Sequence, residues 1–235
     1  MAIGADPSDP EAGVQWPLPP PGGDPGPRLR LGVMASGNGS NFEALVAACR
    51  EGRLSGQVEL LVVNNQGCGA EERARRLGVP CRLLDHRCFA GREALDQALI
   101  AAFREAAVDL VVMAGWMRIV TPLLIEAFPE RLLNIHPSLL PSFRGVDAIG
   151  QALAAGVTLA GCTAHLVAPE VDAGPILVQA AVPVLAGDDA DSLAERIHHQ
   201  EHRILPLAVQ LAAERLRDKT AAAAGRCPPP GPPSG

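Results

Sequence analysis

Four short runs of apolar residues are the strongest constraint on how this chain folds, because they do not alternate with polar residues. The stretches between them carry apolar residues at helical spacing. Strands that are apolar on both faces and joined by helices are typical of a parallel sheet covered on both sides. The sequence therefore predicts a doubly wound α/β fold with a mostly parallel sheet and helices on both faces. The predicted strands are 30–36, 57–64, 80–84 and 109–114, and the predicted helices are 42–50, 70–78 and 92–107.

The pattern changes in the second half of the chain. We expect a further strand over 132–136 and a short helix over 148–155. Two strand-like runs, 162–168 and 176–184, flank a turn sequence and should pair as a C-terminal antiparallel hairpin at one side of the sheet. A long helix over 192–215 should close the domain, with a kink or break at Pro206.

Proline is concentrated at both ends of the chain. Of the 22 prolines, 13 lie in residues 1–28 and 221–235. Proline fixes φ and removes a backbone donor, so segments this rich in Pro and Gly do not sustain helices or sheet ladders. We expect 1–28 and 220–235 to be disordered tails around one domain over 29–219.

Composition excludes several classes of protein. The chain is 48% hydrophobic with a net charge of −6, and 3% of its residues are aromatic, with no tyrosine. This favours a soluble core and disfavours nucleic-acid binding, which needs basic and stacking surfaces. No apolar run approaches the ~18 residues of a membrane span. The six cysteines are scattered, which favours reduced thiols in the cytoplasm. Cys81, His86 and Cys88 lack a closing ligand pair, so we expect no metal.

Residues 36–41, Ser-Gly-Asn-Gly-Ser-Asn, lie between a predicted strand and a predicted helix. Glycines there let the backbone approach a ligand closely, and the N–H groups at a helix start bind anions. The segment matches neither complete nucleotide-binding glycine motif. A phosphate site and a plain tight turn, with Ser40 or Asn41 as N-cap, are both compatible with it.

Asn134 and His136 are polar residues within an otherwise apolar strand. Residues two apart on a strand share a face, and the carboxyl ends of strands are where open α/β sheets bind ligands. They are either buried structural groups or the site of a reacting carbonyl. Asp172 lies in turn-forming sequence; if it approaches His136, it favours the imidazolium. Arg92, Glu201 and the apolar loop 116–120 are weaker candidates.

Taken in order, five segments resemble the phosphoribosylglycinamide formyltransferases of de novo purine synthesis. NIHPSLLP is the segment most specific to folate-dependent formyl transfer. The segments are SGNGSN (36–41), AGWMRIV (114–120), NIHPSLLPSFRG (134–145), DAGP (172–175) and HQEHRILP (199–206).

The resemblance implies transfer of a formyl group from the co-substrate 10-formyltetrahydrofolate to the amine of 5-phosphoribosyl-glycinamide, without a metal. It implies a catalytic trio of Asn134, His136 and Asp172. The positions implied to bind glycinamide ribotide are Gly39, Ser40, Asn41 and Glu201. The positions implied to bind formylfolate are Arg92, Met117, Arg118, Ile119, Val120, Asn134, Ala168, Pro169, Glu170, Val171 and Asp172.

Related enzymes share the Asn-His-Asp chemistry. A methionyl-tRNA formyltransferase would be expected to add a C-terminal RNA-binding domain, and a formyltetrahydrofolate hydrolase an N-terminal regulatory domain. Neither proline-rich end has the composition of a domain. A non-catalytic folate- or nucleotide-binding module is a further alternative, which the intact trio disfavours. Ile149 stands where many members of the family have His. We expect small-molecule substrates, no nucleic-acid or membrane partner, and a monomer or homodimer.

Overall fold

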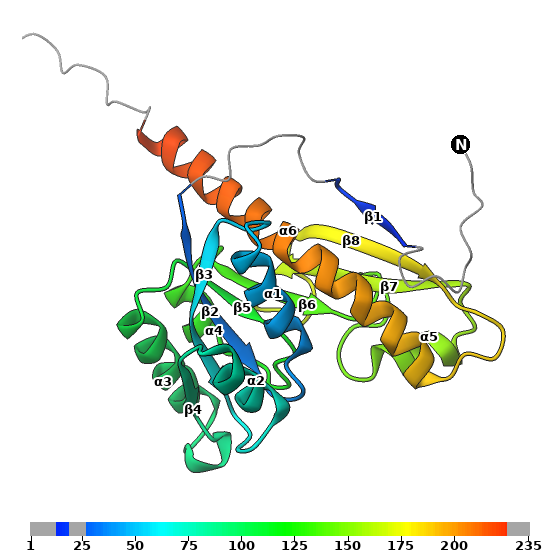
Figure 1. Ribbon diagram of the computed structural model, residues 1–235, viewed down its shortest axis with the longest axis horizontal. Helices are drawn as coiled ribbons and strands as arrows, with labels where there is room; N and C mark the ends of the chain where they lie inside the picture. The colour runs from blue at the N-terminus through cyan, green and yellow to red at the C-terminus, as the bar shows by residue number, and fades with distance from the viewer. Residues whose placement is uncertain (1–12, 19–26, 225–235) are drawn as a thin grey trace, which may run out of the picture.

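The computed structural model describes residues 13–18 and 27–224. In this part of the chain, eight strands form one mixed sheet in the order β1-β8-β7-β6-β5-β2-β3-β4 (Figure 1). One side of the sheet is parallel, from β6 to β4, and the other side is antiparallel. The strands are β1 (Val14–Trp16), β2 (Leu29–Ala35), β3 (Gly56–Val63), β4 (Cys81–Leu83), β5 (Leu110–Met113), β6 (Leu132–His136), β7 (Leu159–Leu166) and β8 (Ile176–Pro183).

Helices cover both faces of the sheet, as the sequence predicts (Figure 1). The two faces have separate apolar cores. One face carries α1 (Ser40–Arg50), α2 (Gly69–Leu77), α5 (Ala148–Ala154) and α6 (Ala190–Ala224). The other carries α3 (Arg92–Glu105) and α4 (Pro122–Ala127), with the short 3-10 helix η1 (His86–Cys88) before α3.

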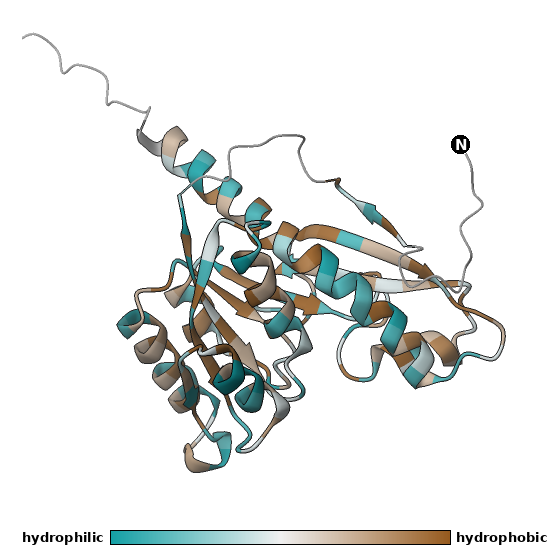
Figure 2. Cartoon of the chain, in the orientation of Figure 1, coloured by the Kyte–Doolittle hydropathy of each residue, from teal (hydrophilic) through white to brown (hydrophobic). Residues whose placement is uncertain are grey.

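Alternation along each strand assigns its side chains to the two cores, and the central strands are accordingly apolar along most of their length (Figure 2). On β6, Leu133 and Ile135 belong to the core under α1 and α6, and Leu132 belongs to the core under α3. Asn134 and His136 therefore lie on the α3 side of the sheet, beyond the last apolar residue of that face.

The predicted doubly wound class and the antiparallel β7–β8 hairpin are confirmed. Pro206 does not break the last helix, because α6 runs continuously from Ala190 to Ala224 through it. Leu205, Pro206 and Leu207 are all buried, so packing compensates the missing backbone hydrogen bond. The part of the predicted tail at 220–224 is helical, since an alanine-rich end has high helix propensity.

The expectation that residues 1–28 lie wholly outside the fold is wrong for residues 14–16. Val14, Gln15 and Trp16 pair antiparallel with Ala181, Ala180 and Gln179 of β8. This short segment lacks proline and can donate to the ladder, and β8 offers an edge that needs a partner. The rest of that tail, apart from residues 13, 17, 18, 27 and 28, lies outside the described residues, as do residues 225–235.

Deletion of residues 1–18 tests the contribution of β1. Val14 and Trp16 remain mostly exposed, so the strand contributes backbone hydrogen bonds and little apolar burial. We expect the melting temperature to fall by about 2–4 °C, as about 1 kcal/mol of lost stability does in a domain of this size. Thermal unfolding followed by circular dichroism measures it. An unchanged melting temperature would show that β1 adds nothing to the sheet.

The Asp188 carboxylate joins the loop before α6 to the first turns of that helix through hydrogen bonds. Its carboxylate accepts hydrogen bonds from the Leu185 backbone N–H at 2.7 Å, from Ser192 Oγ at 3.0 Å, and from both terminal nitrogens of Arg196 at 2.8 and 3.0 Å. The Arg196 hydrogen bond is the largest cause that lowers the pKa of Asp188 from 3.8 to about 2.

A lowered folded-state pKa means that ionised Asp188 stabilises the fold above pH about 4, and that this stability is lost as the pH falls toward about 2. We expect Asp188→Asn to reduce the free energy of unfolding at pH 7 by about 1 kcal/mol, with solvent screening taken into account. The difference from wild type should shrink as the pH falls from about 4 to about 2. Urea titrations across this range test it, with Asp191→Asn as control; a pH-independent difference would contradict the assignment.

Candidate active site

Three loops meet at the carboxyl edge of the parallel strands. β2 pairs with β5, and β5 pairs with β6, all in parallel. The segments that follow these strands, 36–39, 114–121 and 137–147, therefore leave the sheet side by side. This edge is the usual ligand site of open α/β sheets. These three loops contain most of the motif residues identified in the sequence.

Asp172 brings the predicted catalytic trio together. Its Oδ2 lies 3.4 Å from His136 Nδ1, and its Oδ1 lies 3.4 Å from Asn134 Nδ2. The side chains of His136 and Asp172 are 7% and 9% exposed. Residues 38 positions apart in sequence thus form one buried polar cluster on the α3 side of β6.

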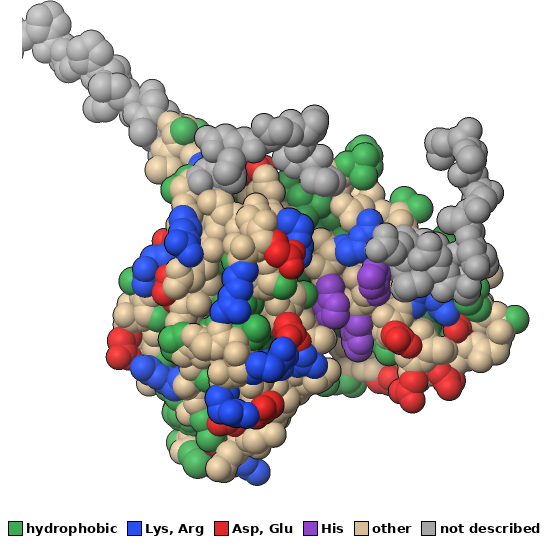
Figure 3. Space-filling view, viewed as in Figure 1, with side chains coloured by type: hydrophobic (Ala, Val, Ile, Leu, Met, Phe, Trp, Pro, Cys, Tyr) green, Lys and Arg blue, Asp and Glu red, His purple; other side chains and the backbone are tan. Residues whose placement is uncertain are grey.

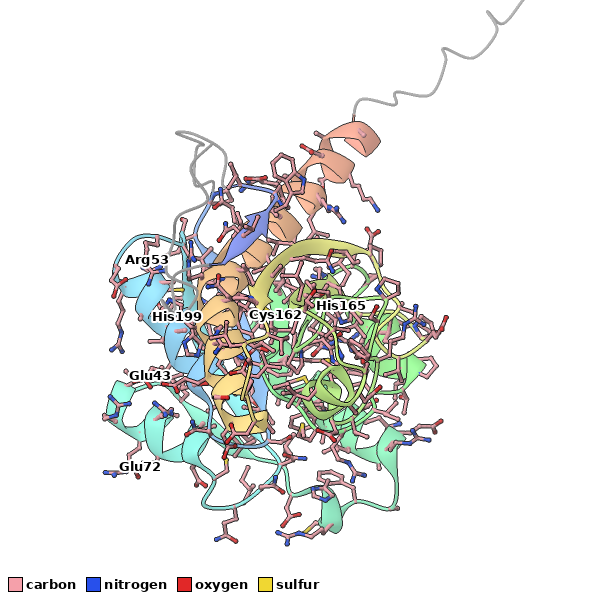
Figure 4. All side chains as sticks on the ribbon, turned by 90° about the vertical axis from the view of Figure 1, so that its right-hand side faces the viewer. Glu43, Arg53, Glu72, Cys162, His165 and His199 are labelled. Atoms are coloured by element: carbon pink, nitrogen blue, oxygen red, sulfur yellow. The ribbon has the colours of Figure 1, made fainter. Side chains whose placement is uncertain are left out.

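His165 of β7 is a fourth member of this cluster, which the sequence analysis did not identify. It pairs with Asn134 across the β6–β7 ladder, and its Nε2 lies 3.2 Å from Asn134 Nδ2 and 3.6 Å from Asp172 Oδ1. Its Nδ1 lies 2.9 Å from the Leu166 carbonyl, which can only accept a hydrogen bond. Figure 4 shows His165 on the strand that also carries Cys162, among densely packed side chains. A polar residue within the apolar run 162–168 was the available signal.

The surroundings of Asp172 favour its ionised form. Burial is the largest single influence and raises the pKa, but other groups together outweigh it: hydrogen bonds from His165 and from the Gly145 backbone N–H, and the charges of His136 and His165. The net effect is a pKa below the usual 3.8. The Gly145 N–H donates to Asp172 Oδ2 at 2.9 Å. The site therefore holds a carboxylate acceptor beside the two imidazoles.

The hydrogen-bond partners of His136 match a doubly protonated ring. Nε2 lies 2.9 Å from the Phe143 carbonyl, and Nδ1 faces the Asp172 carboxylate. Both partners are acceptors, so each ring nitrogen can use a proton. The 3.4 Å separation from the carboxylate is long for a hydrogen bond, so the Nδ1 side is the one that can exchange partners.

The backbone around Asp172 is held in an uncommon conformation. Asp172 has a φ of 51° in the left-handed region, which is costly for a non-glycine residue and often marks a functional site. A Cβ at Gly174 would lie 1.8 Å from the Leu166 carbonyl oxygen, so the turn can pack against β7 only with glycine there. Leu166 N–H donates to the Pro175 carbonyl at 2.9 Å beside this contact.

The loop 36–41 opens onto the N-terminus of α1. The N-cap is Gly39, with φ 78°, and no side chain caps the helix, so neither Ser40 nor Asn41 takes the N-cap position that a plain turn would give one of them. A Cβ at Gly39 would lie 2.6 Å from Ala70 Cα of α2, so glycine is required by packing as well as by φ. The uncapped N–H groups suit an anion.

Glu201 of α6 reaches this loop. Its Oε2 accepts a hydrogen bond from Asn41 Nδ2 at 2.7 Å, which joins α6 to α1. Burial raises the pKa of Glu201, against the smaller lowering influences of His198 and Asn41. The structure thus brings together Asn41 and Glu201, both predicted to contact the same substrate.

Basic side chains lie near the loop 36–41 and its contact with Glu201. Histidines of α6 group on the face shown in Figure 3, where they lie close to arginine side chains. The pKa of His202 is lowered by burial first, and then by the charges of His198, His199 and Arg73. Arg73 of α2 also donates to the Asn38 carbonyl at 2.9 Å. The loop 36–41 is therefore bordered by basic side chains of α2 and α6, with Arg73 paired to Glu43, and by the Glu201 carboxylate.

The predicted formylfolate positions lie on the α3 side of the site. Met117 and Ile119 are 77% and 56% exposed, although the segment follows a buried strand, and Val171 is also exposed. Ala168, Pro169, Glu170 and Val171 lie in the β7–β8 connection (167–175) directly before Asp172, and Glu170 pairs with Arg144 at 2.7 Å. Arg92 and Arg118 make no contact with the trio among the described interactions. Arg92 is exposed at the start of α3.

Across residues 13–18 and 27–224, no group of three His, Cys, Asp or Glu side chains is arranged to hold a metal ion. None of the described helices is long and apolar enough to span a membrane.

Comparison with known proteins gives a consistent match. Residues 29–209 match the family model described as formyl transferase. The chain is 41% identical over 186 residues to the phosphoribosylglycinamide formyltransferase of Escherichia coli, covering 79% of this chain and 88% of that protein. It resembles the crystal structure of glycinamide ribonucleotide transformylase 1 from Symbiobacterium toebii, with 48% identity, a TM-score of 0.78, and coverage of 80% and 88% of the two chains.

A further relative is much longer. The chain is 42% identical over 186 residues to the human trifunctional purine biosynthetic protein adenosine-3, covering 79% of this chain and 18% of that protein. The chain thus spans less than a fifth of the length of this relative.

The sequence and the fold together show that this chain belongs to the formyl transferase family. Within that family, the relatives that it matches over most of their length carry the name phosphoribosylglycinamide formyltransferase. The resemblance found in the sequence is thereby confirmed.

Ile149 packs in α5 as a partly buried residue against the core under α1 and α6. Its aliphatic side chain cannot carry a proton.

Gly174→Ala tests whether close packing of the turn places Asp172. The added Cβ overlaps the Leu166 carbonyl oxygen, so the turn must move away from β7 and carry the Asp172 carboxylate with it. We expect turnover to fall by about 10²-fold, because a displacement of about 1 Å has that effect on an aligned site. Steady-state kinetics and a crystal structure of the variant measure both parts. Gly187→Ala, whose Cβ meets no neighbour, is the control for a strained glycine position; a nearly normal rate in Gly174→Ala would contradict the packing argument.

Proposed function

We propose that this protein transfers the formyl group of 10-formyltetrahydrofolate to the primary amine of 5-phosphoribosyl-glycinamide, in de novo purine synthesis. The observation that carries the proposal is the Asp172 carboxylate, which lies 3.4 Å from both His136 Nδ1 and Asn134 Nδ2 at the carboxyl edge of the sheet. The relatives named phosphoribosylglycinamide formyltransferase support the choice of reaction and acceptor.

The proposed reaction begins when the substrate amine attacks the formyl carbon. A tetrahedral intermediate forms with negative charge on the former carbonyl oxygen, and donors placed at that oxygen stabilise it. The Asn134 amide and a protonated His136 are the donors within the site. Asn134 Nδ2 contacts His165 at 3.2 Å and Asp172 at 3.4 Å, so the longer Asp172 contact is the one that the oxyanion would replace.

The intermediate then collapses with cleavage of the bond between the formyl carbon and the folate nitrogen. That nitrogen must leave with a proton, which His136 can deliver as a general acid. The attacking nitrogen must lose a proton, and Asp172 is an ionised acceptor beside His136 that can take it directly or through water. The proton count then balances without a metal or covalent intermediate.

The two substrates are proposed to approach from opposite faces of the sheet. The ribotide phosphate would lie at Gly39, Ser40 and Asn41, with Glu201 on its ribose side, where α1 presents open N–H groups. Formylfolate would lie on the α3 side, among the positions from Met117 to Val120, Ala168 to Asp172, and Arg92. Bringing two reactants into line can itself supply a large part of the acceleration.

We further propose that the protein acts in the cytoplasm on small molecules. Cys49, Cys68, Cys81, Cys88 and Cys162 are free thiols, as expected in a reducing compartment. No feature of the site favours a nucleic-acid or membrane partner.

The deciding experiment offers the purified protein 10-formyltetrahydrofolate with three acceptors in separate reactions: glycinamide ribotide, methionyl-tRNA, and water alone. Absorbance of the tetrahydrofolate product follows each reaction. We expect turnover with glycinamide ribotide alone. No turnover by folded protein would overturn the proposal, and preferential use of tRNA or water would reassign the chain to one of the related activities.

Substitution of the two donors tests their roles. His136→Ala and Asn134→Ala should each lower kcat by ~10²-fold or more, as loss of an oxyanion donor does. His86→Ala, which changes a partly buried histidine of η1 after the edge strand β4, is the control. It should leave kcat within about twofold, because His86 contacts Asn64 and no member of the trio. Circular dichroism and melting temperature confirm folding. A nearly normal rate in either site variant would remove that residue from the mechanism.

A further inference from the structure

The segment Gly115–Thr121 connects β5 to α4 without regular secondary structure. It contains the four positions Met117 to Val120 that the proposed function assigns to formylfolate. Trp116 and Val120 turn into the core under α3 and α4, while Met117 and Ile119 point outward. The outward side chains can contact a ligand only if the backbone between the two buried ones is held in place.

Two buried side chains hold the backbone at either end of this segment. Ser36 Oγ accepts a hydrogen bond from the Met117 N–H at 2.9 Å, and the Ser36 N–H donates to the Gly115 carbonyl at 3.0 Å. At the other end, Asp96 Oδ2 accepts from the Thr121 N–H at 2.6 Å. Ser36 and Asp96 are 5% and 2% exposed. Each anchor satisfies a backbone donor outside any helix or strand, and such a donor is costly to leave unpaired.

Neither anchor is explained by the fold alone. Asp96 is a carboxylate buried on α3 one turn after Arg92, and burial raises its pKa against the lowering influence of Thr121 and Arg92. A buried carboxylate costs stability unless it is paired, so a position that retains one needs a reason. Ser36 is the first residue of the loop 36–41, and its carbonyl also accepts from Asn65 Nδ2 at 2.7 Å.

We propose that Ser36 and Asp96 are positioning residues that fix the segment Gly115–Thr121 in the conformation that binds formylfolate; the ligand in this inference rests on the proposed function. Neither residue needs to touch the ligand. Because Ser36 belongs to the loop 36–41 and anchors Met117, it also ties the position of one substrate loop to the other.

Kinetics of three variants test the ligand part of this proposal. Asp96→Ala and Ser36→Ala should each raise KM for 10-formyltetrahydrofolate by about tenfold, which corresponds to about 1.4 kcal/mol. In Asp96→Ala, kcat and KM for glycinamide ribotide should stay within about twofold. The reason is that the anchor affects folate binding equally in the ground state and the transition state. Asp96→Asn should restore most of the affinity, since its amide oxygen can accept the Thr121 N–H.

Asp109→Ala is the matched control. Asp109 also accepts a hydrogen bond from a backbone N–H, that of Arg30, at 2.8 Å, but it lies beyond the other end of α3. A folate KM in Asp96→Ala and Ser36→Ala no higher than in Asp109→Ala would overturn the proposal. An equal rise in the KM of Asp96→Ala for both substrates would also overturn the proposal.

Fluorescence tests the positioning part without turnover. In a Trp16→Phe background, Trp116 is the single tryptophan and reports on the segment. Acrylamide quenching of Trp116 in the free protein should rise about twofold in the two alanine variants, since the segment then opens more often. It should stay at the parent value in Asp109→Ala.

The two measurements separate the two hypotheses. Absence of turnover in the wild type would contradict the proposed function. Quenching in the two alanine variants that equals the parent value would contradict the positioning role, whatever the activity. Melting temperatures establish that the variants are folded. If Asp96→Ala does not fold, the folate KM and the acrylamide quenching of Ser36→Ala test the proposal, each compared with Asp109→Ala.

Discussion

The site depends on one buried carboxylate and the need to compensate its charge. Asp172 is reached by His136 and Asn134 of β6, His165 of β7, and the Gly145 N–H of the loop after β6. A buried ion without partners is strongly destabilising, so these groups converge on it by physical necessity. The same convergence assembles donors and acceptors around a point where a carbonyl could react. The structural requirement and the chemical arrangement therefore have one origin.

The change of strand direction between β6 and β7 makes this convergence possible. The parallel strands all end at one edge, and an antiparallel neighbour returns from that edge with His165 opposite Asn134. The β7–β8 connection begins beside Leu132, at the start of β6, and folds back along the α3 side of the sheet to bring Asp172 to Asn134 and His136. One proposed substrate loop leaves β2 toward α1, and the other proposed substrate loop leaves β5 toward α4. Such a layout suits a transfer between two bound molecules better than hydrolysis of one.

The sequence predicts the parts of this arrangement that local patterns determine. Continuous apolar runs indicate the strands, and the spacing of Asn134 and His136 indicates a shared face. The convergence of Asp172 on them came from family resemblance, because no local pattern reports a contact across 38 residues. His165 was missed because its role depends on the β6–β7 register, which composition does not encode. β1 was missed because the prolines around it mask a three-residue strand that forms only against the edge of β8. The sequence allowed a break at Pro206, but the helix continues through it because buried neighbours compensate the lost hydrogen bond.

Ile149 of α5, on the α1 and α6 side of the sheet, is not a proton carrier. A histidine at that position would offer a further ionisable side chain, but the isoleucine packs against apolar neighbours instead. The proton carriers that contact one another around the trio are then Asp172, His136 and His165, all largely buried. His165 Nδ1 faces the Leu166 carbonyl, and a neutral ring would leave Nε2 free to accept from Asn134. Protonation of His165 would remove that acceptor and set its new N–H against the amide donor. The orientation of Asn134 therefore depends on whether His165 Nε2 accepts from the Asn134 amide or donates to Asp172, so His165 is part of the arrangement that positions the reactive donors.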